Sequence, residues 1–521
     1  MFVVDWLHKQ AQHHPDKPAL VDAATGHGIS YRLLDERASR FAEWLCGPAG
    51  LQPGDRLAVL AGNGTEYLEM LYGCAKAGVI MACLNWRLPV AELRGIVDDA
   101  APRAWVCDAG YAEAVAELAA DGAPRLVLAA AGGCDDYEQA LAAASGRIIE
   151  MPPRAMDAPW HLLYTSGTTG RPKGVIQTFG MVFFNAVNTM LATRLSGADT
   201  LLSALPFFHT GGLNLYTNPI LHAGGTVVVM RQFDAGEALR WLDGRGRLVD
   251  PATGAARLLP VTQFLGVPAL YLFMAQHADF GQTRFAAMRH WSAGGAPMPA
   301  KVLETWAARG VTICFGFGMT ETGPTVFIPD ELTAQTKPGS VGKPVGSMLV
   351  RLVDREGRDC DPGEAGELLV RGPGVTPGYW NDPLASAEAL REGWLHTGDV
   401  ARCDAEGDYW IVDRVKEMYI SGGENVYPAE VENALYRLPG VAEAAVVGVP
   451  DARWGEAGVA VIVSAPGVQL SEETVRAHCR AQLAGYKVPA RVLFIDALPR
   501  TPAGKVEKPL LRQRLAAATE G

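Results

Sequence analysis

Apolar positions along the first half of the chain alternate between two spacings. GDRLAVLAGN (54–63) contains the short apolar run of a buried strand, and GTEYLEMLYGCAKAG after it has the three-to-four-residue spacing of a helix. VIMACLN and AELRGIVDDA repeat this order, and it returns between residues 200 and 233. Strands that alternate with helices are typical of parallel sheets covered on both faces. We therefore predict an α/β fold for this part.

The pattern changes twice in the last third of the chain. Between residues 340 and 412, short strands such as LVRLVD and GELLVRG are separated by Gly, Pro and Asp turns, which predicts a small β-barrel-like subdomain. After DRVKE (413–417), PAEVENALYRL and SEETVRAHCRAQL predict helices, and three apolar runs between and after them predict strands. About a hundred residues of this kind are expected to form a small α+β C-terminal domain. The polar insert GRGRLVDPATGAARLLP (244–260) is predicted to be a surface hairpin.

Composition narrows the class of protein. A chain of 521 residues is expected to form two or more domains, and a net charge of −11 argues against a nucleic-acid partner. Nine cysteines lie scattered without CxxC spacing, which suits a reducing cytoplasm and does not favour zinc. Because no apolar run approaches the ~18 residues of a membrane span, we expect a cytoplasmic protein without a transmembrane segment and with an amphipathic first helix.

The stretch YTSGTTGRPKGV (164–175) is rich in glycine and hydroxyl side chains and contains one lysine. Such runs cradle phosphate, because glycine lets backbone N–H groups approach an anion. The spacing differs from the common phosphate loop, since Arg171 follows Gly170 where that loop has lysine. Composition alone therefore leaves a phosphate site and a flexible linker equally open.

Five further stretches are unusual for packing alone. They are LPFFHTGGL (205–213), SAGGAPMP (292–299), FGFGMTETGP (315–324), GWLHTGDVA (393–401) with DRVKEMYISGGENVYPAEVE (413–432), and PRTPAGKVEK (499–508). In order and spacing, and over nearly the whole chain, they resemble the adenylate-forming superfamily of acyl-CoA synthetases, firefly luciferase and nonribosomal peptide adenylation domains. The resemblance implies an AMP-forming acid–thiol ligase with ATP, Mg²⁺ and coenzyme A as cofactors.

The resemblance assigns a role in acyl-adenylate formation to each motif. Lys505 would balance charge between the carboxylate and the α-phosphate, Thr320 would bond the α-phosphate, and Glu321 would hold magnesium. Asp399 would accept from the ribose hydroxyls, and Arg414 would add a donor. The phosphate loop is implied to comprise Thr165, Ser166, Gly167, Thr168, Thr169, Gly170 and Lys173. The adenine and acyl surfaces are implied to comprise Gly294, Gly295, Ala296, Phe315, Gly316, Phe317, Gly318 and Met319, with Phe317 against the base.

For thioester formation, the resemblance implies a small mobile domain at 416–521 that rotates on a domain at 1–415. The hinge would lie near 413–417, on Lys416. Gly422 and Gly423 would line the pantetheine channel, and Trp454 would pack on CoA. His209 would lie between the acyl pocket and the thiol tunnel, although a lone loop histidine is as often structural. Lys508 is expected to be solvated.

The acid itself is not fixed by these motifs. Residues 207–218 contain no carboxylate that could pair with an amino group, so an apolar acid is expected, with a medium- or long-chain fatty acid favoured. The alternatives are an aryl acid of the cinnamate or benzoate type, an acyl-AMP ligase that loads a carrier protein, a luciferase-like oxygenase and a catalytically silent nucleotide-binding protein. A homodimer is compatible with this interpretation.

Overall fold

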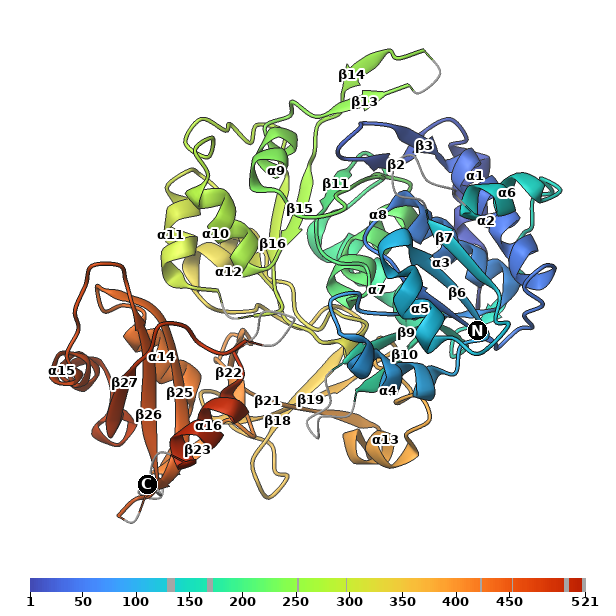
Figure 1. Cartoon of the computed structure of the whole chain (residues 1–521). Helices are drawn as coiled ribbons and strands as arrows, with labels where there is room; N and C mark the ends of the chain where they lie inside the picture. Colours follow the sequence, from blue (N-terminus) through green and yellow to red (C-terminus); the bar gives the residue numbers. More distant parts are fainter. Residues whose placement is uncertain are drawn as a thin grey trace. The chain divides into compact units, whose positions relative to one another are not determined.

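The computed structural model describes residues 1–128, 136–165, 172–250, 253–296, 298–421, 424–451, 453–500 and 506–517. The chain divides into two compact units (Figure 1). The first consists of Met1–Leu349 and Val370–Leu395, and the second of Val350–Leu369 and His396–Gly521.

Two mainly parallel sheets form the first unit. The six-stranded sheet has the order β10-β9-β5-β4-β6-β7, and the seven-stranded sheet has the order β17-β16-β15-β11-β12-β2-β3. Edge strands β10 and β3 run antiparallel to their neighbours, and the other pairs are parallel. The first sheet contains β4 (Arg56–Leu60), β5 (Ile80–Cys83), β6 (Ala104–Asp108), β7 (Arg125–Leu128), β9 (Pro159–Thr165) and β10 (Lys173–Thr178). The second contains β2 (Pro18–Asp22), β3 (Gly28–Ser30), β11 (Thr200–Ser203), β12 (Thr226–Val229), β15 (Gln263–Gly266), β16 (His290–Ala293) and β17 (Cys314–Phe315).

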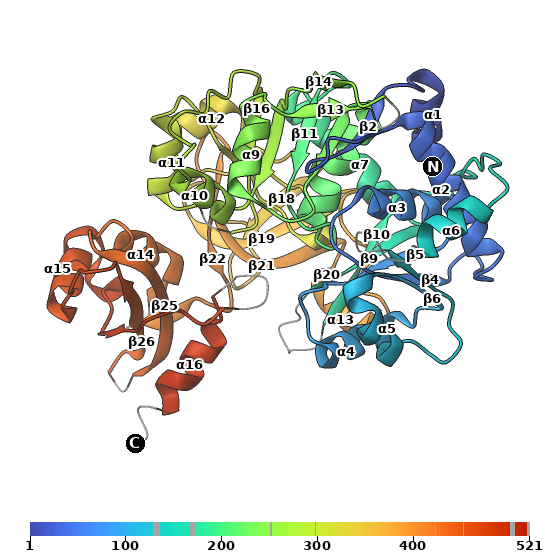
Figure 2. The ribbon, with the colours of Figure 1, turned by 45° about the horizontal axis from the view of Figure 1, so that its top comes forward.

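Alternate residues of one strand enter different cores. In β4, Leu57 and Val59 belong to the largest core, whereas Ala58 and Leu60 belong to a smaller core on the opposite face. The largest core also receives residues of β11 and β12, so helices α2, α3, α7 and α8 lie between the two sheets (Figure 2). These helices are α2 (Tyr31–Cys46), α3 (Thr65–Ala77), α7 (Phe179–Thr193) and α8 (Thr217–Ala223). Burial on both faces explains why these strands are continuously apolar.

Other helices cover the outer faces of the two sheets. Side chains of α4 (Val90–Ala100) and α5 (Ala112–Leu118) cover the first sheet, and those of α9 (Ala235–Leu242), α10 (Pro268–Gln276) and α11 (Ala300–Ala307) cover the second. The remaining helical elements of this unit are α1 (Trp6–His13), α6 (Asp136–Ala143), α12 (Glu331–Thr336), α13 (Pro383–Ala389), η1 (Ala109–Tyr111), η2 (Gly211–Leu215) and η3 (Thr320–Thr322). Two small antiparallel pairs complete it, β1 (Phe2–Val3) with β8 (Arg154–Ala155) and β13 (Arg247–Val249) with β14 (Ala256–Leu258).

The last third of the chain forms a sheet of β18 to β22, which contains residues of both units, followed by an α+β fold in the second unit. The sheet has the order β18-β19-β21-β20, with β22 paired to β21, and its strands carry the chain across the division between the units. These strands are β18 (Leu349–Val353), β19 (Ala365–Arg371), β20 (Leu390–Arg391), β21 (Trp394–Cys403) and β22 (Tyr409–Arg414). The α+β part contains β23 (Tyr419–Ser421), β24 (Glu424–Val426), β25 (Val441–Asp451), β26 (Gly455–Ser464), β27 (Arg491–Phe494), α14 (Pro428–Leu435), α15 (Glu472–Gln482), η4 (Gly485–Lys487) and α16 (Lys508–Ala517).

The predicted fold class is confirmed, and several predicted elements occur at the expected positions. The insert at 244–260 forms the β13–β14 hairpin, and the first helix begins at Trp6 with the side chain of Asp5 as its cap. Ser471 caps α15 by accepting from the backbone N–H of Thr474. The eight cysteines in the described part of the chain are free thiols.

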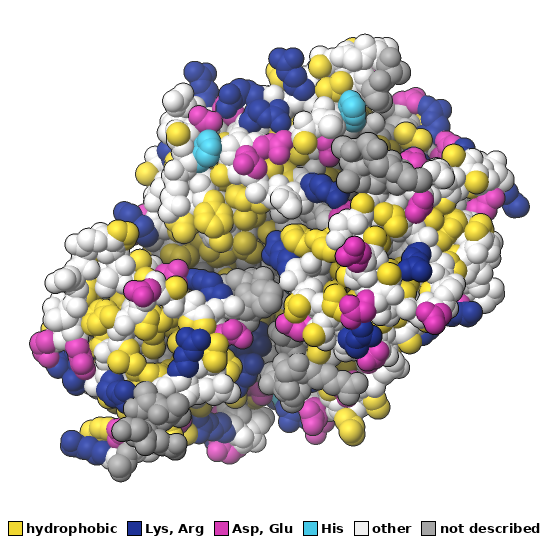
Figure 3. All heavy atoms as spheres, in the orientation of Figure 1, with side chains coloured by type: hydrophobic (Ala, Val, Ile, Leu, Met, Phe, Trp, Pro, Cys, Tyr) yellow, Lys and Arg dark blue, Asp and Glu magenta, His cyan; other side chains and the backbone are white. Residues whose placement is uncertain are grey.

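The surface charge and the length of the helices concern the expectations about a nucleic-acid partner and a transmembrane segment. Lys and Arg side chains are interspersed with Asp and Glu on the face shown in Figure 3. Among the described residues, every helix is too short or too polar to cross a lipid bilayer.

Candidate active site

The phosphate stretch closes a β-hairpin at the edge of the six-stranded sheet. Thr165 ends β9 and lies opposite Lys173, the first residue of β10. Both are partly buried. The two residues therefore hold the ends of the glycine-rich loop together. Ser166, Gly167, Thr168, Thr169 and Gly170, which form its body, lie outside the described residues.

Tyr379 connects the lysine of this hairpin to the expected magnesium ligand. Its hydroxyl donates to Oε1 of Glu321 over 3.0 Å, and the Nζ of Lys173 lies 4.8 Å from the centre of its ring. Burial first, and then the negative charge of Glu321, raise the pKa of the Tyr379 hydroxyl, so it remains a donor at neutral pH. The backbone of Glu321 is held as well, because its carbonyl accepts from the N–H of Thr376 over 2.8 Å. A phosphate-loop cation and a carboxylate thus share one aromatic side chain.

Glu321 is a suitable ligand for magnesium. Its side chain is buried, with 7% of the residue exposed, in the short helix η3. Mg²⁺ prefers carboxylate and phosphate oxygens. The residues present therefore fit the ion, which would neutralise phosphate charge when bound.

The glycine-rich segments follow the carboxyl ends of two neighbouring parallel strands. Gly294, Gly295 and Ala296 follow β16, Gly316 to Met319 follow β17, and Gly316 donates its N–H to the carbonyl of Ala293 over 2.9 Å. Ligands of α/β folds bind at such strand ends. Two positions require glycine, since Gly295 has a φ of +83° and a Cβ on Gly318 would lie 1.5 Å from the carbonyl oxygen of Pro324. Phe317 and Phe327 exchange backbone hydrogen bonds, which keeps the segment folded back on itself.

His209 starts the turn that leads into the π-helical η2. Its carbonyl accepts from the N–H groups of Gly212 and Leu213, both over 3.1 Å, and its ring packs against Phe208 with 4.4 Å between ring centres. The turn places the segment 209–216 beside β16, because the hydroxyl of Tyr216 lies 2.5 Å from Oγ of Ser292. The structure thus joins the segment 207–218, from which we infer an apolar acid, to the strand that leads into Gly294 and Gly295.

A buried polar trio lies at this junction. Nε2 of His290 is 2.8 Å from Oγ of Ser292, which is also bonded to Tyr216. Burial lowers the pKa of His290 to about 4 and raises that of Tyr216, so both side chains are neutral at pH 7. If His290 donates, the Tyr216 hydroxyl is left to donate onward, and if His290 accepts, that hydroxyl donates to Ser292. The trio can therefore adapt to a donor or an acceptor.

In the second unit, the two expected ribose ligands are paired with each other. Asp399 and Arg414 lie opposite each other on β21 and β22, and Nε of Arg414 is 2.7 Å from Oδ1 of Asp399. Asp399 is 4% exposed, and its N–H donates to Oγ1 of Thr397. Asp399 is thus a buried carboxylate that faces a guanidinium, not a solvated surface residue.

Charged side chains also occupy the segment of the expected hinge. The pKa of Lys416 is lowered, mainly by burial and then by the charge of Arg414. Asp413 accepts from the N–H of Ala429 at the start of α14 over 2.9 Å, and burial raises its pKa. Arg512 of α16 is 2.5 Å from Glu417. The segment 413–417 is thus held to α14 and α16 by polar contacts.

The expectation for Lys508 is wrong. Its Nζ lies 2.7 Å from Oε1 of Glu432, and its side chain is only 16% exposed. Burial raises the pKa of Glu432, against the opposing charge of Lys508. Lys508 forms a largely buried ion pair because α16 packs against β25, which returns the end of the chain to the core of the unit.

The remaining expected residues fall into two groups. Trp454 is 46% exposed, and the guanidinium of Arg453 lies 4.6 Å from the centre of its ring. Lys505, Gly422 and Gly423 lie outside the described residues. Their assigned roles therefore remain predictions.

Sequence reasoning missed Tyr379 and Gln177 as site residues. Gln177, in β10, is completely buried and donates from Nε2 to the carbonyl of Thr320 over 2.8 Å. A glutamine that follows the apolar pair Val175 and Ile176, two residues after the phosphate stretch, is a signal that could have indicated it. Tyr379 lies in a segment more than two hundred residues from that stretch, and its position depends on tertiary structure.

Comparison with known proteins identifies the family. Residues 7–380 match the family described as AMP-binding enzyme, and residues 430–505 match the AMP-binding enzyme C-terminal domain. The chain belongs to this family.

Relatives of the chain are similar over its whole length. A feruloyl-CoA synthase of an Amycolatopsis species is 40% identical over 509 residues, covering 98% of this chain and 98% of that protein. The long-chain-fatty-acid–CoA ligase FadD13 of Mycobacterium tuberculosis is 33% identical over 521 residues, covering 99% of each. The crystal structure of ATP-bound MatB from Rhodopseudomonas palustris is 33% identical, has a TM-score of 0.87 and covers 98% of both chains.

The expected superfamily and enzyme class are confirmed. The chain is an AMP-forming acid–thiol ligase of the adenylate-forming superfamily, and its cofactors are ATP, Mg²⁺ and CoA. The identity of the acid and the roles of single residues are separate questions.

Proposed function

We propose that this enzyme is an aryl-acid CoA ligase, whose substrate is an aromatic carboxylic acid with a polar ring substituent. The observation that carries the proposal is the buried trio of Tyr216, Ser292 and His290. A phenolic hydroxyl or an ether oxygen can join its hydrogen bonds, whereas an alkyl chain cannot. The 40% identity with a feruloyl-CoA synthase supports the same choice.

The fatty-acid interpretation remains the second candidate. It is favoured by the similarity to FadD13 and by the apolar character of 207–218. An alkyl chain would gain from apolar burial at about 0.8 kcal/mol for each methylene, but it would offer the trio no hydrogen bond. Loss of the Tyr216 hydroxyl should therefore lower activity with a polar aryl acid and leave activity with a fatty acid nearly unchanged.

The proposed reaction has two steps. The substrate carboxylate attacks the α-phosphorus of ATP, the bond to the β-phosphate oxygen breaks, and pyrophosphate leaves with an acyl-adenylate in the site. The thiolate of CoA then attacks the acyl carbon, and AMP leaves. The first step brings two anions together, so the site must neutralise charge and hold the reactants in line.

This chain's own residues would divide that work. Lys173 would bind the β- and γ-phosphates, Thr320 would donate to the α-phosphate, and Lys505 would balance the charge that develops there. Tyr379 would orient the Glu321 carboxylate, which would hold magnesium. Asp399 would bind the ribose, and Arg414 would have to share it with that ligand.

The experiment is an acid panel with purified enzyme. We expect CoA-dependent AMP formation with ferulate and p-coumarate at a kcat/KM at least tenfold above that for any C4 to C16 fatty acid. Pyrophosphate exchange without CoA reports the first step alone. Higher turnover of the fatty acids would overturn the proposal, acyl transfer to a carrier protein but not to CoA would indicate a loading enzyme, and no exchange with any acid would indicate a silent nucleotide-binding protein.

A further inference from the structure

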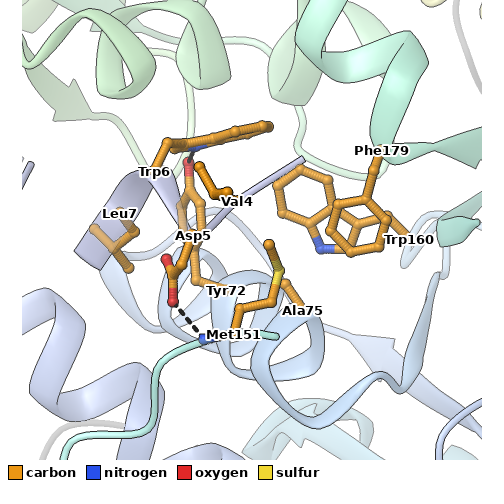
Figure 4. A pocket seen from close by; sticks show the side chains of 9 residues that line it. All are labelled: Val4, Asp5, Trp6, Leu7, Tyr72, Ala75, Met151, Trp160 and Phe179. Atoms are coloured by element: carbon orange, nitrogen blue, oxygen red, sulfur yellow. Dashed lines mark hydrogen bonds between the residues drawn. The ribbon is translucent and has the colours of Figure 1, made fainter. Parts of the chain in front are cut away.

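A directed chain of buried hydrogen bonds crosses the first unit and ends at Thr320. It begins where Nε1 of Trp6 donates to the hydroxyl of Tyr72 over 3.4 Å, beside a small cavity under α1 (Figure 4). Four further bonds follow: Tyr72 to Oδ1 of Asn218 (3.2 Å), Nδ2 of Asn218 to Oδ1 of Asn214 (3.0 Å), Nδ2 of Asn214 to Oε1 of Gln177 (3.2 Å), and Nε2 of Gln177 to the carbonyl of Thr320 (2.8 Å). Every donor points toward the nucleotide segment.

The last hydrogen bonds of the chain are made by completely buried amides. Gln177, Asn214 and Asn218 are all 0% exposed, so water cannot replace a lost partner. Bonds that share one direction polarise one another and strengthen the chain. The carbonyl of Thr320 also accepts from Gly323, but over 3.4 Å, so Gln177 provides its shorter bond.

The ring of His161 lies beside the Asn214 amide. Nδ2 of Asn214 lies 3.1 Å from Nε2 of His161, which must accept and therefore be unprotonated there. Burial lowers the pKa of His161 to about 3, so the ring is neutral at physiological pH. The Nδ2 of this amide faces Gln177, His161 and Thr210, and its Oδ1 accepts from Asn218.

A second connection joins the same two segments. Asn185 of α7 donates to the backbone carbonyl of Asn214 over 2.5 Å, and its side-chain oxygen accepts from the hydroxyl of Thr325 over 2.6 Å. The segment 209–216 is therefore attached at two points to 320–325. One segment carries His209 and Tyr216, and the other carries Thr320 and Glu321.

We propose that Gln177 and Asn214 form a positioning pair that sets Thr320 against the α-phosphate in register with the acid-binding segment. This inference rests on the proposed function, because only adenylation needs acid and nucleotide held together. Neither residue touches the reacting atoms. They act through the Thr320 backbone, and a shift of that segment of about 1 Å is enough to slow an in-line reaction.

The test compares Gln177→Leu with Gln263→Leu. Gln263 is a matched control, since it is also a 0% exposed strand glutamine, but it lies in β15 of the seven-stranded sheet and donates to Asp199, the residue before β11. We expect Gln177→Leu to weaken Mg-ATP binding, measured by calorimetry without any acid, by about tenfold, and to lower kcat for pyrophosphate exchange by at least as much. Gln263→Leu should leave both values within twofold of wild type, whatever its effect on thermal stability.

Gln177→Glu provides a readout that a purely structural role would not change. A protonated glutamate can accept from Asn214 and donate to Thr320, whereas an ionised one turns a carboxylate toward the Thr320 carbonyl. Burial raises the pKa of such a carboxyl. The exchange rate of this variant relative to wild type should therefore fall as pH rises from 5.5 to 8.5, and the variant is informative even if Gln177→Leu does not fold.

The outcomes separate the two proposals. If wild-type enzyme binds Mg-ATP but fails to exchange pyrophosphate with every acid tested, the proposed function is wrong. The ATP affinity of the variants would still decide the role of Gln177. Unchanged ATP affinity in Gln177→Leu, or a flat pH profile in Gln177→Glu, would overturn the positioning pair.

Discussion

The Tyr379 hydroxyl donates to a carboxylate oxygen of Glu321 over 3.0 Å while its ring lies under the ammonium group of Lys173. The two contacts use different parts of one side chain. They can therefore be removed separately.

Tyr379→Phe removes the hydroxyl and keeps the ring. We expect the KM for Mg-ATP in pyrophosphate exchange to rise about five- to tenfold, because Glu321 loses the bond that orients it. Tyr137→Phe is the matched control, since the Tyr137 hydroxyl donates to buried Glu69, also over 3.0 Å, away from the phosphate hairpin. A similar rise in KM in the control would show a general loss of packing.

Tyr216→Phe tests the polar trio with two acids that differ by one hydroxyl. For p-coumarate we expect kcat/KM to fall about tenfold, the cost of one buried hydrogen bond, while cinnamate should change less than threefold. The measurement is CoA-dependent AMP release. Equal losses for both acids would place the hydroxyl of Tyr216 outside the acid site.

His161 predicts acid sensitivity of the first unit. Its folded pKa of about 3 lies below the ordinary value of 6.5, so the unfolded chain binds the extra proton between these pH values. The free energy of unfolding should therefore fall as pH decreases below 6.5, with a contribution from this group of up to ~1.4 kcal/mol for each pH unit.

Urea unfolding at pH 7, 6 and 5 measures this contribution. In His161→Gln the free energy of unfolding should depend less steeply on pH than in wild type. His13→Gln, a change at an exposed histidine, is the control and should keep the wild-type dependence. His222 and His290, whose pKa values burial lowers to about 4, will retain part of the slope. An unchanged slope in His161→Gln would contradict the assignment of a neutral ring.

The ion pair between Lys508 and Glu432 predicts that removal of the lysine destabilises the second unit. Lys508→Met leaves a largely buried carboxylate without its cation, and we expect the second unit to lose ~2 kcal/mol near neutral pH. Burial already raises the pKa of Glu432, and loss of Lys508 raises it further. Above the ordinary pKa of a glutamate, the folded variant then binds more protons than the unfolded chain. The free energy of unfolding of this variant should therefore rise as pH falls.

The double variant Lys508→Met, Glu432→Gln checks that explanation. It should recover most of the loss and show no added pH dependence, because no uncompensated charge remains. Chemical unfolding followed by a probe in the second unit provides the measurement. A double variant as unstable as Lys508→Met would indicate lost packing instead.

Sequence reasoning reached the elements whose causes are local. The buried strand that contains Leu57 and Ala58, the helix that begins at Trp6 and the hairpin at 244–260 all follow from spacing and turn residues. Adenylate-forming motifs could likewise be placed from their residues and order. Such features depend on neighbours within a few positions of the chain.

Contacts between distant segments could not be predicted in this way. Gln177 and Thr320 are separated by 143 residues, and Lys508 meets Glu432 only because α16 packs on β25. A buried amide in a strand indicates that a partner exists, but not which one. The prediction for Lys508 was wrong because a lysine near a chain end is usually solvated, and its sequence neighbours do not indicate the ion pair with Glu432.

The path of the backbone limits where the α+β fold could rotate relative to the rest of the chain. The chain passes between the two compact units at 349–350, 369–370 and 395–396, so three covalent links tether one to the other. One segment of the chain, which contains Lys416, joins the sheet of β18 to β22 to the α+β fold. Polar contacts hold this segment to α14 and α16, Asp413 with Ala429 and Glu417 with Arg512. If the α+β fold turns about Lys416, as the resemblance to the family implies, these two contacts would have to break before the turn.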